Sequence, residues 1–217
     1  MISFSPPDIT EAEITEVAEA MRSGWITTGP RTKKLEAGLA KFCGTKKVCC
    51  LNSATSSLEL ILRILGVKSG DEVITSAYTY TATCSVICHV GATPILVDVE
   101  KDSYQLNLNQ VSDAITERTK VIIPVDIGGT MCDYDKLFEI VEDKKKLFRS
   151  DSSIQKVFNR IIIVSDGAHA LGSTYKGLRC GEIADFTTFS LVVLKNRTRC
   201  QKRSQVGNLA PAGSFLP

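Results

Sequence analysis

Short apolar runs alternate with helical patterns along most of this chain, and that alternation limits the fold more than any other feature. The clearest runs are EVITS, KVIIPV and RIIIVSD, which are too short for helices and are bounded by polar or glycine-containing segments. Strands that are apolar throughout are typical of a parallel sheet covered on both faces. The expected fold is therefore a three-layer α/β/α domain with a mainly parallel sheet.

The segments between these runs carry helix signals. Thr10 and Glu13 form a T-x-x-E capping box, and a later helix carries Leu58 and Leu62 on one face, with Glu59 and Arg63 spaced as an ion pair on the other. Further helices are predicted near residues 32–42, 81–90, 107–117 and 133–147. The sequence also predicts strands at KVCCL (47–51), TPILVDV (93–99) and DFTTFS (185–190), and a surface loop over 148–158.

Composition argues against several classes of protein. The 8 cysteines include no C-x-x-C pair and only 2 histidines are present, so no metal site is predicted. Of 26 basic and 24 acidic residues, four basic and no acidic ones follow Lys195, which leaves the body slightly acidic and argues against nucleic-acid binding. The first residues lack a signal-peptide pattern and no apolar run reaches the length of a membrane span, so we expect a cytoplasmic protein.

Several unusual residues fall at the carboxyl ends of predicted strands, where ligands bind in folds of this kind. In LNSATSSLEL, Thr55 lies where a helix begins, and the free N–H groups there suit a phosphate, although a simple cap by Ser53 or Thr55 explains the pattern too. In SAYTYTAT, Tyr78 and Tyr80 either offer an aromatic face to a planar ligand or pack in the core.

Two more candidates follow later strands. Asp166 ends RIIIVSD, where an unpaired buried carboxylate would be costly, and His169 comes three residues later; a capping Asp and a structurally satisfied His explain the pattern too. Lys195 follows an apolar run and is either a solvated lysine or a desolvated one that loses its proton readily, as Schiff-base chemistry requires. A helix start that suits a phosphate, an aromatic ring, a buried carboxylate and a lysine are together what the binding of pyridoxal phosphate (PLP) requires. A dinucleotide site is disfavoured because G-x-G-x-x-G is missing after the first strand.

The sequence resembles the DegT/StrS-type nucleotide-sugar aminotransferases, which belong to the fold-type I class of PLP-dependent enzymes. The likeness covers residues 3 to about 190, through SGWITTGPR, LNSATSSLEL, GDEVITSAYTYTAT, GATPILVDVE, IIPVDIGG, SDGAHALG and DFTTFS. It implies a PLP-binding large domain over residues 1–195 with an N-terminal helical segment, and a homodimer. It also implies transfer of an amino group, with glutamate as the donor, to a nucleotide-linked keto sugar in amino-sugar biosynthesis for surface polysaccharide or related glycoconjugates.

The resemblance extends to individual residues. The implied phosphate ligands are Thr55, Ser56 and Ser190. Tyr80 aligns with the ring that stacks on the pyridine, and Asp166 with the partner of the pyridine nitrogen. The implied catalytic residues are Asp166, His169 near the ring hydroxyl, and Lys195 as the Schiff-base lysine. A dehydratase branch has His at the lysine position, so Lys195 argues against that branch.

One further segment has an implied role toward the substrate. The residues that resemble the sugar side of the family's site are Gly24, Trp25, Thr27 and Thr28.

The sequence departs from the family pattern after Ser190. Leu191 and Val192 replace a Phe-His pair, and Glu-Gly-Gly is missing after Lys195. We expect the basic, Gly/Pro/Ala-containing tail 196–217 to be disordered or aberrant, after a loss of reading frame between Leu191 and Asn196, with the C-terminal small domain absent. The alternative function is then a non-catalytic large domain that binds PLP weakly or serves as an interaction module. We expect no aminotransferase activity from this chain alone.

Overall fold

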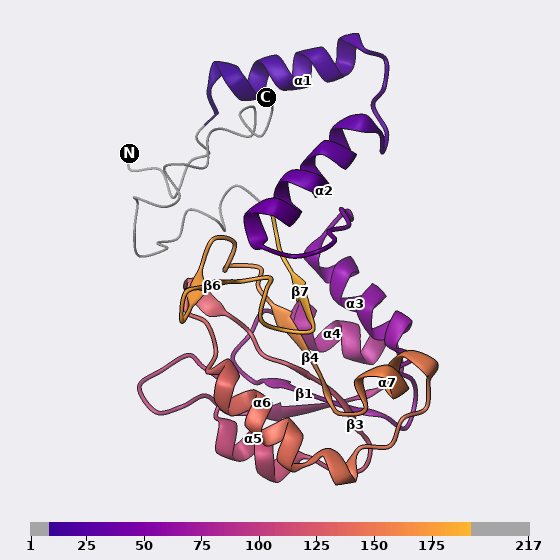
Figure 1. Cartoon of the computed structure of the whole chain (residues 1–217), viewed down its shortest axis with the longest axis vertical. Helices are drawn as coiled ribbons and strands as arrows, with labels where there is room; N and C mark the ends of the chain where they lie inside the picture. Colours follow the sequence, from indigo (N-terminus) through magenta and orange to yellow (C-terminus); the bar gives the residue numbers. More distant parts are fainter. Residues whose placement is uncertain (1–8, 192–217) are drawn as a thin grey trace.

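A five-stranded parallel sheet forms the centre of the protein (Figure 1). The computed structural model describes residues 9–191. The strand order is β2-β1-β3-β4-β7, and every pairing is parallel. The strands are β1 (Glu72–Ser76), β2 (Thr93–Val97), β3 (Thr119–Ile123), β4 (Ile162–Asp166) and β7 (Phe186–Thr188). The predicted α/β fold with a mainly parallel sheet is confirmed.

Alternate residues of each strand enter opposite layers of the protein, because side chains alternate across a strand. Ile74 and Ile122 pack with α5 (Leu108–Ala114) and α6 (Tyr134–Asp143). Val73 and Val121 pack with α3 (Ala54–Leu65) and α4 (Thr81–His89) on the other face. All four of these strand side chains are 0% exposed. The two helix pairs cover opposite faces of the sheet (Figure 1), which explains the uninterrupted apolar runs in the sequence.

The chain reverses its direction across the sheet between β1 and β3. From β1 it passes through α4 to β2 at one edge, and then through α5, on the opposite face, to β3 on the other side of β1. A reversal of this kind leaves a crevice at the carboxyl ends of the two strands, where α/β proteins bind their ligands.

The two N-terminal helices extend away from the sheet (Figure 1). They are α1 (Glu11–Arg22) and α2 (Pro30–Cys43). The predicted capping box is present, since the Glu13 carboxylate accepts from the Thr10 N–H at 2.7 Å. No residue of α1 is buried, and α2 buries only Leu39 and Cys43. The α1 helix therefore leaves most of its apolar surface uncovered within one copy of the described chain.

The predicted strand KVCCL is wrong. Residues 47–51 belong to no strand, and none of them is buried. The Cys50 N–H donates to the Glu36 side chain at 2.9 Å instead of to a neighbouring strand. An apolar run alone does not make a strand when no sheet edge is beside it.

The predicted loop 148–158 is also wrong at its end, where the short helix α7 (Ser153–Phe158) forms. Gln155 of α7 is 0% exposed, and its Nε2 donates to the Leu65 carbonyl at 2.9 Å. Ser152, the N-cap of α7, donates to the same carbonyl at 2.8 Å. Together they satisfy the last carbonyl of α3, which has no partner within its own helix.

Three small elements complete the described fold. They are the 3-10 turns η1 (Ile127–Gly129) and η2 (Lys145–Leu147), and a hairpin of β5 (Thr174–Tyr175) and β6 (Leu178–Arg179). The η2 turn follows α6, which is therefore shorter than the predicted helix 133–147.

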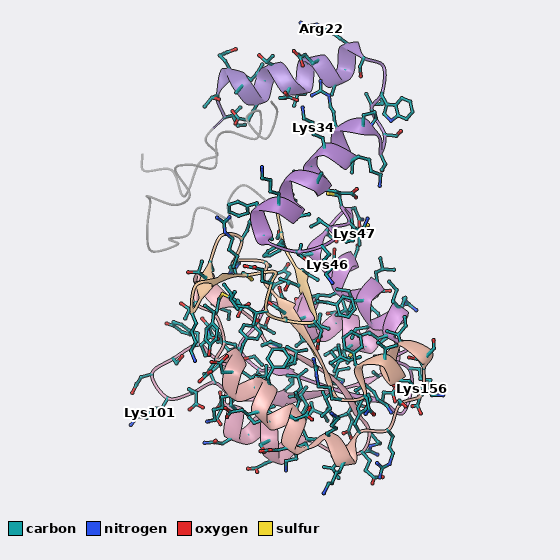
Figure 2. All side chains as sticks on the ribbon, viewed as in Figure 1. Arg22, Lys34, Lys46, Lys47, Lys101 and Lys156 are labelled. Carbon is teal, nitrogen blue, oxygen red and sulfur yellow. The ribbon has the colours of Figure 1, made fainter. Side chains whose placement is uncertain are left out.

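We expect Gln155→Ala to lower the free energy of unfolding by about 1–3 kcal/mol, because it removes a buried amide that satisfies backbone groups. The control is Lys156→Ala, which changes an exposed side chain of the same helix (Figure 2) and should alter stability by no more than about 0.5 kcal/mol. Urea denaturation measures both. Equal losses in the two variants would mean that the contact between α7 and α3 contributes nothing to stability.

Candidate active site

A cleft of about 470 Å³ lies at the carboxyl ends of β1, β3 and β4. Residues 77–80 after β1, residues 125–127 after β3 and Asp166 at the end of β4 contribute to its lining, and the first turn of α3 closes one side. The cleft therefore occupies the crevice that the reversal of strand order creates. Four of the predicted site residues meet there, namely Thr55, Tyr80, Asp166 and His169.

In the first turn of α3, a side chain caps one N–H group, and other N–H groups of the turn suit a ligand. The Ser53 Oγ accepts from the Ser56 N–H at 3.1 Å and lies 2.9 Å from the Ser56 Oγ. The amides of Ala54 and Thr55 belong to the same turn, in which a helix offers no acceptor of its own, and both residues line the cleft. The cap and the predicted anion-binding end therefore coexist, because the cap uses a different N–H group.

Asp166 is buried, with 7% of its surface exposed, and it points toward the layer of α3 and α4. Its direction follows from the alternation along β4, in which Ile162 and Val164 face the same layer. Its Oδ2 accepts from the Thr83 hydroxyl at 2.7 Å, and its Oδ1 from the Ala168 N–H at 3.2 Å. The carboxylate thus has a donor on each oxygen, which offsets part of the cost of its burial.

Neither candidate tyrosine packs in the core. Tyr80 is 75% exposed and Tyr78 is 52% exposed, so the core-packing interpretation is wrong. Tyr78 stacks on Tyr104, with ring centroids 5.1 Å apart and an interplanar angle of 23°. Both tyrosines line the cleft, and Tyr80 is the more exposed of the two, so the geometry favours Tyr80 as the ring that a planar ligand would contact.

Asp126, which had no predicted role, lines the cleft and is 0% exposed. Its Oδ2 accepts from the Tyr134 hydroxyl at 2.8 Å and from the Ser165 hydroxyl at 2.7 Å, and its Oδ1 from the Cys132 N–H at 2.9 Å. Burial raises its pKa from the ordinary 3.8 to about 6, although these hydrogen bonds act in the opposite direction. The available signal was its position in IIPVDIGG, where it follows an apolar run as Asp166 ends RIIIVSD.

The backbone joins the two carboxylate positions. The Asp126 N–H donates to the Asp166 carbonyl at 3.1 Å, and the Asp166 N–H donates to the Pro124 carbonyl at 2.9 Å. Ser165, which lies between Val164 and Asp166 on β4, donates its hydroxyl to Asp126 in the opposite layer. The ends of β3 and β4 are therefore locked in register at the floor of the cleft.

The remaining predicted residues lie elsewhere. Ser56 and Ser190 are not part of the cleft lining among residues 9–191, although Ser190 is buried just after β7. The segment with Gly24, Trp25, Thr27 and Thr28 forms the turn between α1 and α2, at the end of α2 away from the sheet (Figure 1). Lys195 and the tail 196–217 lie outside the described residues.

The described residues contain neither a metal-binding group nor a membrane-spanning helix. Between residues 9 and 191, no three His, Cys, Asp or Glu side chains group in a way that could hold a metal ion. Over the same range, no helix has the length and apolar character needed to cross a membrane.

Comparison with protein-family models places residues 7–200 in a match to the DegT/DnrJ/EryC1/StrS aminotransferase family. Among solved structures, the chain is similar to Spr1654 of Streptococcus pneumoniae, which is named as a sugar aminotransferase, in its PLP form. The two are 62% identical with a TM-score of 0.88, and the match covers 90% of this chain and 50% of that chain. The PMP form of the same protein matches with a TM-score of 0.88 and 62% identity, over 90% of this chain and 49% of the other.

Curated relatives give the same result. The spore coat polysaccharide biosynthesis protein SpsC of Bacillus subtilis is 35% identical over 195 residues, which are 90% of this chain and 46% of the relative. A UDP-4-amino-4-deoxy-L-arabinose–oxoglutarate aminotransferase of Shewanella sediminis is 38% identical over 195 residues, with the same coverage of 90% and 46%. The chain spans about half the length of the relatives that it matches.

We expect the stability of the protein to fall as the pH rises through the titration of Asp126. Its folded pKa of about 6 lies above its ordinary value of 3.8, so the folded state binds the proton more tightly. The resulting stabilisation is complete below about pH 4 and is lost above about pH 6, and it amounts to about 2–3 kcal/mol at roughly 1.4 kcal/mol per unit.

Denaturation of the wild type and of Asp126→Asn between pH 4 and pH 7 measures this effect. The buried neighbours Cys132, Tyr134 and Cys180 have pKa values raised by burial, so they stay neutral over this range. The wild type should lose stability relative to the Asn variant as the pH rises. Parallel stability curves for the two proteins would show that Asp126 does not titrate in this window.

Proposed function

Because the chain belongs to the DegT/DnrJ/EryC1/StrS aminotransferase family, whose members depend on PLP, we propose that its cleft binds PLP for the transfer of an amino group to a keto sugar. We further propose that the sugar is linked to a nucleotide and that glutamate is the amino donor. The observation that carries the proposal is the grouping of Thr55, Tyr80, Asp166 and His169 around one cleft at the strand ends. The name of the Shewanella relative, with its UDP-sugar and oxoglutarate, supports the finer part.

The residues of the cleft fit PLP in three respects. A phosphate suits the first turn of α3, with Thr55 at the cleft and Ser56 and Ser190 proposed as further ligands. A planar ring suits the exposed face of Tyr80, and a ring nitrogen suits the buried carboxylate of Asp166. A volume of about 470 Å³ lies within the usual range for small-molecule sites.

When bound, PLP acts as an electron sink for the substrate carbon that gains or loses the amino group. In this proposal, Asp166 keeps the ring nitrogen protonated through a charge-assisted hydrogen bond of about 1.5–3 kcal/mol. His169 interacts with the ring hydroxyl from its place on the cleft lining. Lys195, outside the described residues, would hold the cofactor and move a proton at the substrate carbon.

We also propose that the PLP-binding domain spans residues 1–195 and that two copies form a homodimer. On α1, the spacing of Ile14, Val17 and Met21 places three side chains with 51%, 63% and 68% exposure on one helix face. A partner subunit would cover this face. The turn with Gly24, Trp25, Thr27 and Thr28, which does not line its own cleft, would then contribute to the sugar side of the partner subunit's site.

The cysteines support the proposed cytoplasmic location. All seven cysteines among the described residues are free thiols, as expected of a protein from a reducing compartment.

The proposal is tested by adding PLP to the purified chain, reducing with borohydride and mapping the modified peptide by mass spectrometry. We expect one PLP per chain, attached to Lys195, because the cofactor aldehyde should lie over that lysine. Lys46 and Lys47, from the connection between α2 and α3 (Figure 2), are internal controls and should stay unmodified. Scattered modification of several lysines would contradict a PLP site.

Turnover with a keto-sugar nucleotide and glutamate then separates the two functions. The molar mass of the protein tests the proposed homodimer. Specific labelling of Lys195 with turnover supports the aminotransferase. Specific labelling without turnover from this chain favours the alternative, a non-catalytic module that binds PLP.

Tyr80 can be tested against its neighbour. We expect Tyr80→Phe to keep PLP affinity, since either ring supplies a face, and Tyr80→Ala to weaken it by about 2- to 10-fold. The matched control is Tyr78→Ala, which removes the less exposed of the two rings and should weaken PLP binding less. A titration followed by absorbance measures all three. A larger loss in Tyr78→Ala than in Tyr80→Ala would assign the stacking role to Tyr78.

A further inference from the structure

Thr83 on α4 is a fully buried polar residue that makes contact with Asp166 from below the cleft. It is 0% exposed and does not line the cleft itself. Its Oγ1 lies 2.7 Å from the Asp166 Oδ2 and 2.9 Å from the Thr79 Oγ1. Thr79, in contrast, does line the cleft, on the segment that carries Tyr80.

The direction of these hydrogen bonds follows from the chemistry of the groups. The Thr83 hydroxyl donates its single proton to the Asp166 Oδ2, so toward any second hydroxyl it can only accept. Thr83 then accepts from Thr79, and the chain runs from the Thr79 hydroxyl through Thr83 to Asp166. The Ala168 N–H holds the other carboxylate oxygen at 3.2 Å. Both oxygens are thus held, and the plane of the carboxylate is fixed.

The same residue also connects Asp166 to the tyrosine. The Thr83 N–H donates to the Tyr80 carbonyl at 3.1 Å in the first turn of α4. The first turn of α4 and the Thr83 hydroxyl therefore join Tyr80, the proposed stacking residue, to Asp166, the proposed partner of the ring nitrogen. These two groups would contact the same ligand ring, one at its face and one at its edge.

We propose that Thr83 is a positioning residue, which holds the Asp166 carboxylate in line with a ligand ring nitrogen and at a fixed position relative to Tyr80. This inference rests on the proposed function, since it takes Asp166 as the partner of that nitrogen. Thr83 acts through Asp166 and touches neither cofactor nor substrate.

The test uses two probes that cannot react with a lysine. One is 4′-deoxypyridoxine 5′-phosphate, which keeps the ring nitrogen and the phosphate, and the other is its analogue with carbon in place of the ring nitrogen. Thr83→Val removes the hydroxyl at nearly constant shape, and Thr83→Ser restores it. The matched control is Thr75→Val, because Thr75 is also 0% exposed and donates to the Ile123 carbonyl at 2.8 Å outside the cleft lining.

We expect Thr83→Val to weaken binding of the nitrogen-containing probe by about 5- to 20-fold and that of the carbon analogue by less than about 2-fold. Thr83→Ser and Thr75→Val should bind both probes as the wild type does, within about 3-fold. An equal loss for both probes, wild-type affinity in Thr83→Val, or the same loss in Thr75→Val would overturn the positioning role.

Hydrogen exchange on the ligand-free protein keeps the inference separate from the proposed function. If the wild type binds neither probe, the proposed PLP site fails. The amides of residues 166–170 then decide the role of Thr83, since the Ala168 N–H is held by the Asp166 carboxylate. Faster exchange there in Thr83→Val but not in Thr75→Val supports the positioning role, and unchanged exchange overturns it.

Discussion

The covering of the sheet on both faces determines where the carboxylate at the end of β4 points. Along β4, Ile162 and Val164 face the layer of α3 and α4, so Asp166 faces that layer too. Ser165 faces the opposite layer and donates to Asp126. A shift of one residue in the register of β4 would exchange the two and would turn Ser165 away from Asp126 and Asp166 away from Thr83. The direction of the carboxylate is therefore set by the register of β4 as well as by its own hydrogen bonds.

The carboxylates of Asp166 and Asp126 lie at neighbouring strand ends but in different surroundings. Asp166 borders the cleft and keeps a donor on each oxygen. Asp126 is more deeply buried, and the hydrogen bonds that it accepts do not prevent burial from raising its pKa. Asp166 is thus the acid that a ligand could contact, while Asp126 links neighbouring elements at the floor of the site.

The sheet and the main helices could be predicted from the sequence because their signals are repeated and local. Short runs that contain Val and Ile identified β1, β3 and β4, and the spacing of Leu58 and Leu62 identified α3. KVCCL has the same local composition, but a strand also needs a neighbour to pair with, and this information is not local. The α7 helix, at 6 residues, is too short to show a helical period, and it is stabilised by its contact with the end of α3.

The candidate site likewise contains residues that local sequence signals predict and residues that they do not. Strand ends and a helix start identified Thr55, Tyr80, Asp166 and His169, which the fold brings to one cleft. Thr83 was not predicted, because its importance depends on a partner 83 positions away in the sequence. Asp126 had a signal in its position within IIPVDIGG, but its burial and its bond from Ser165 depend on the fold. Nothing in the residues alone separates Tyr78 from Tyr80, and it is their different exposure in the fold that distinguishes them.

The bond between Thr83 and Asp166 joins residues 83 positions apart, across three strands of the sheet. Such a bond exists only after β1, β3 and β4 have assembled, so a form of the chain without this sheet lacks it. A ligand of this cleft consequently favours the forms in which the sheet is assembled. Each tenfold excess of ligand over its Kd adds about 1.4 kcal/mol to the free energy of unfolding, and the ligand thereby protects the chain against proteolysis during and after its synthesis.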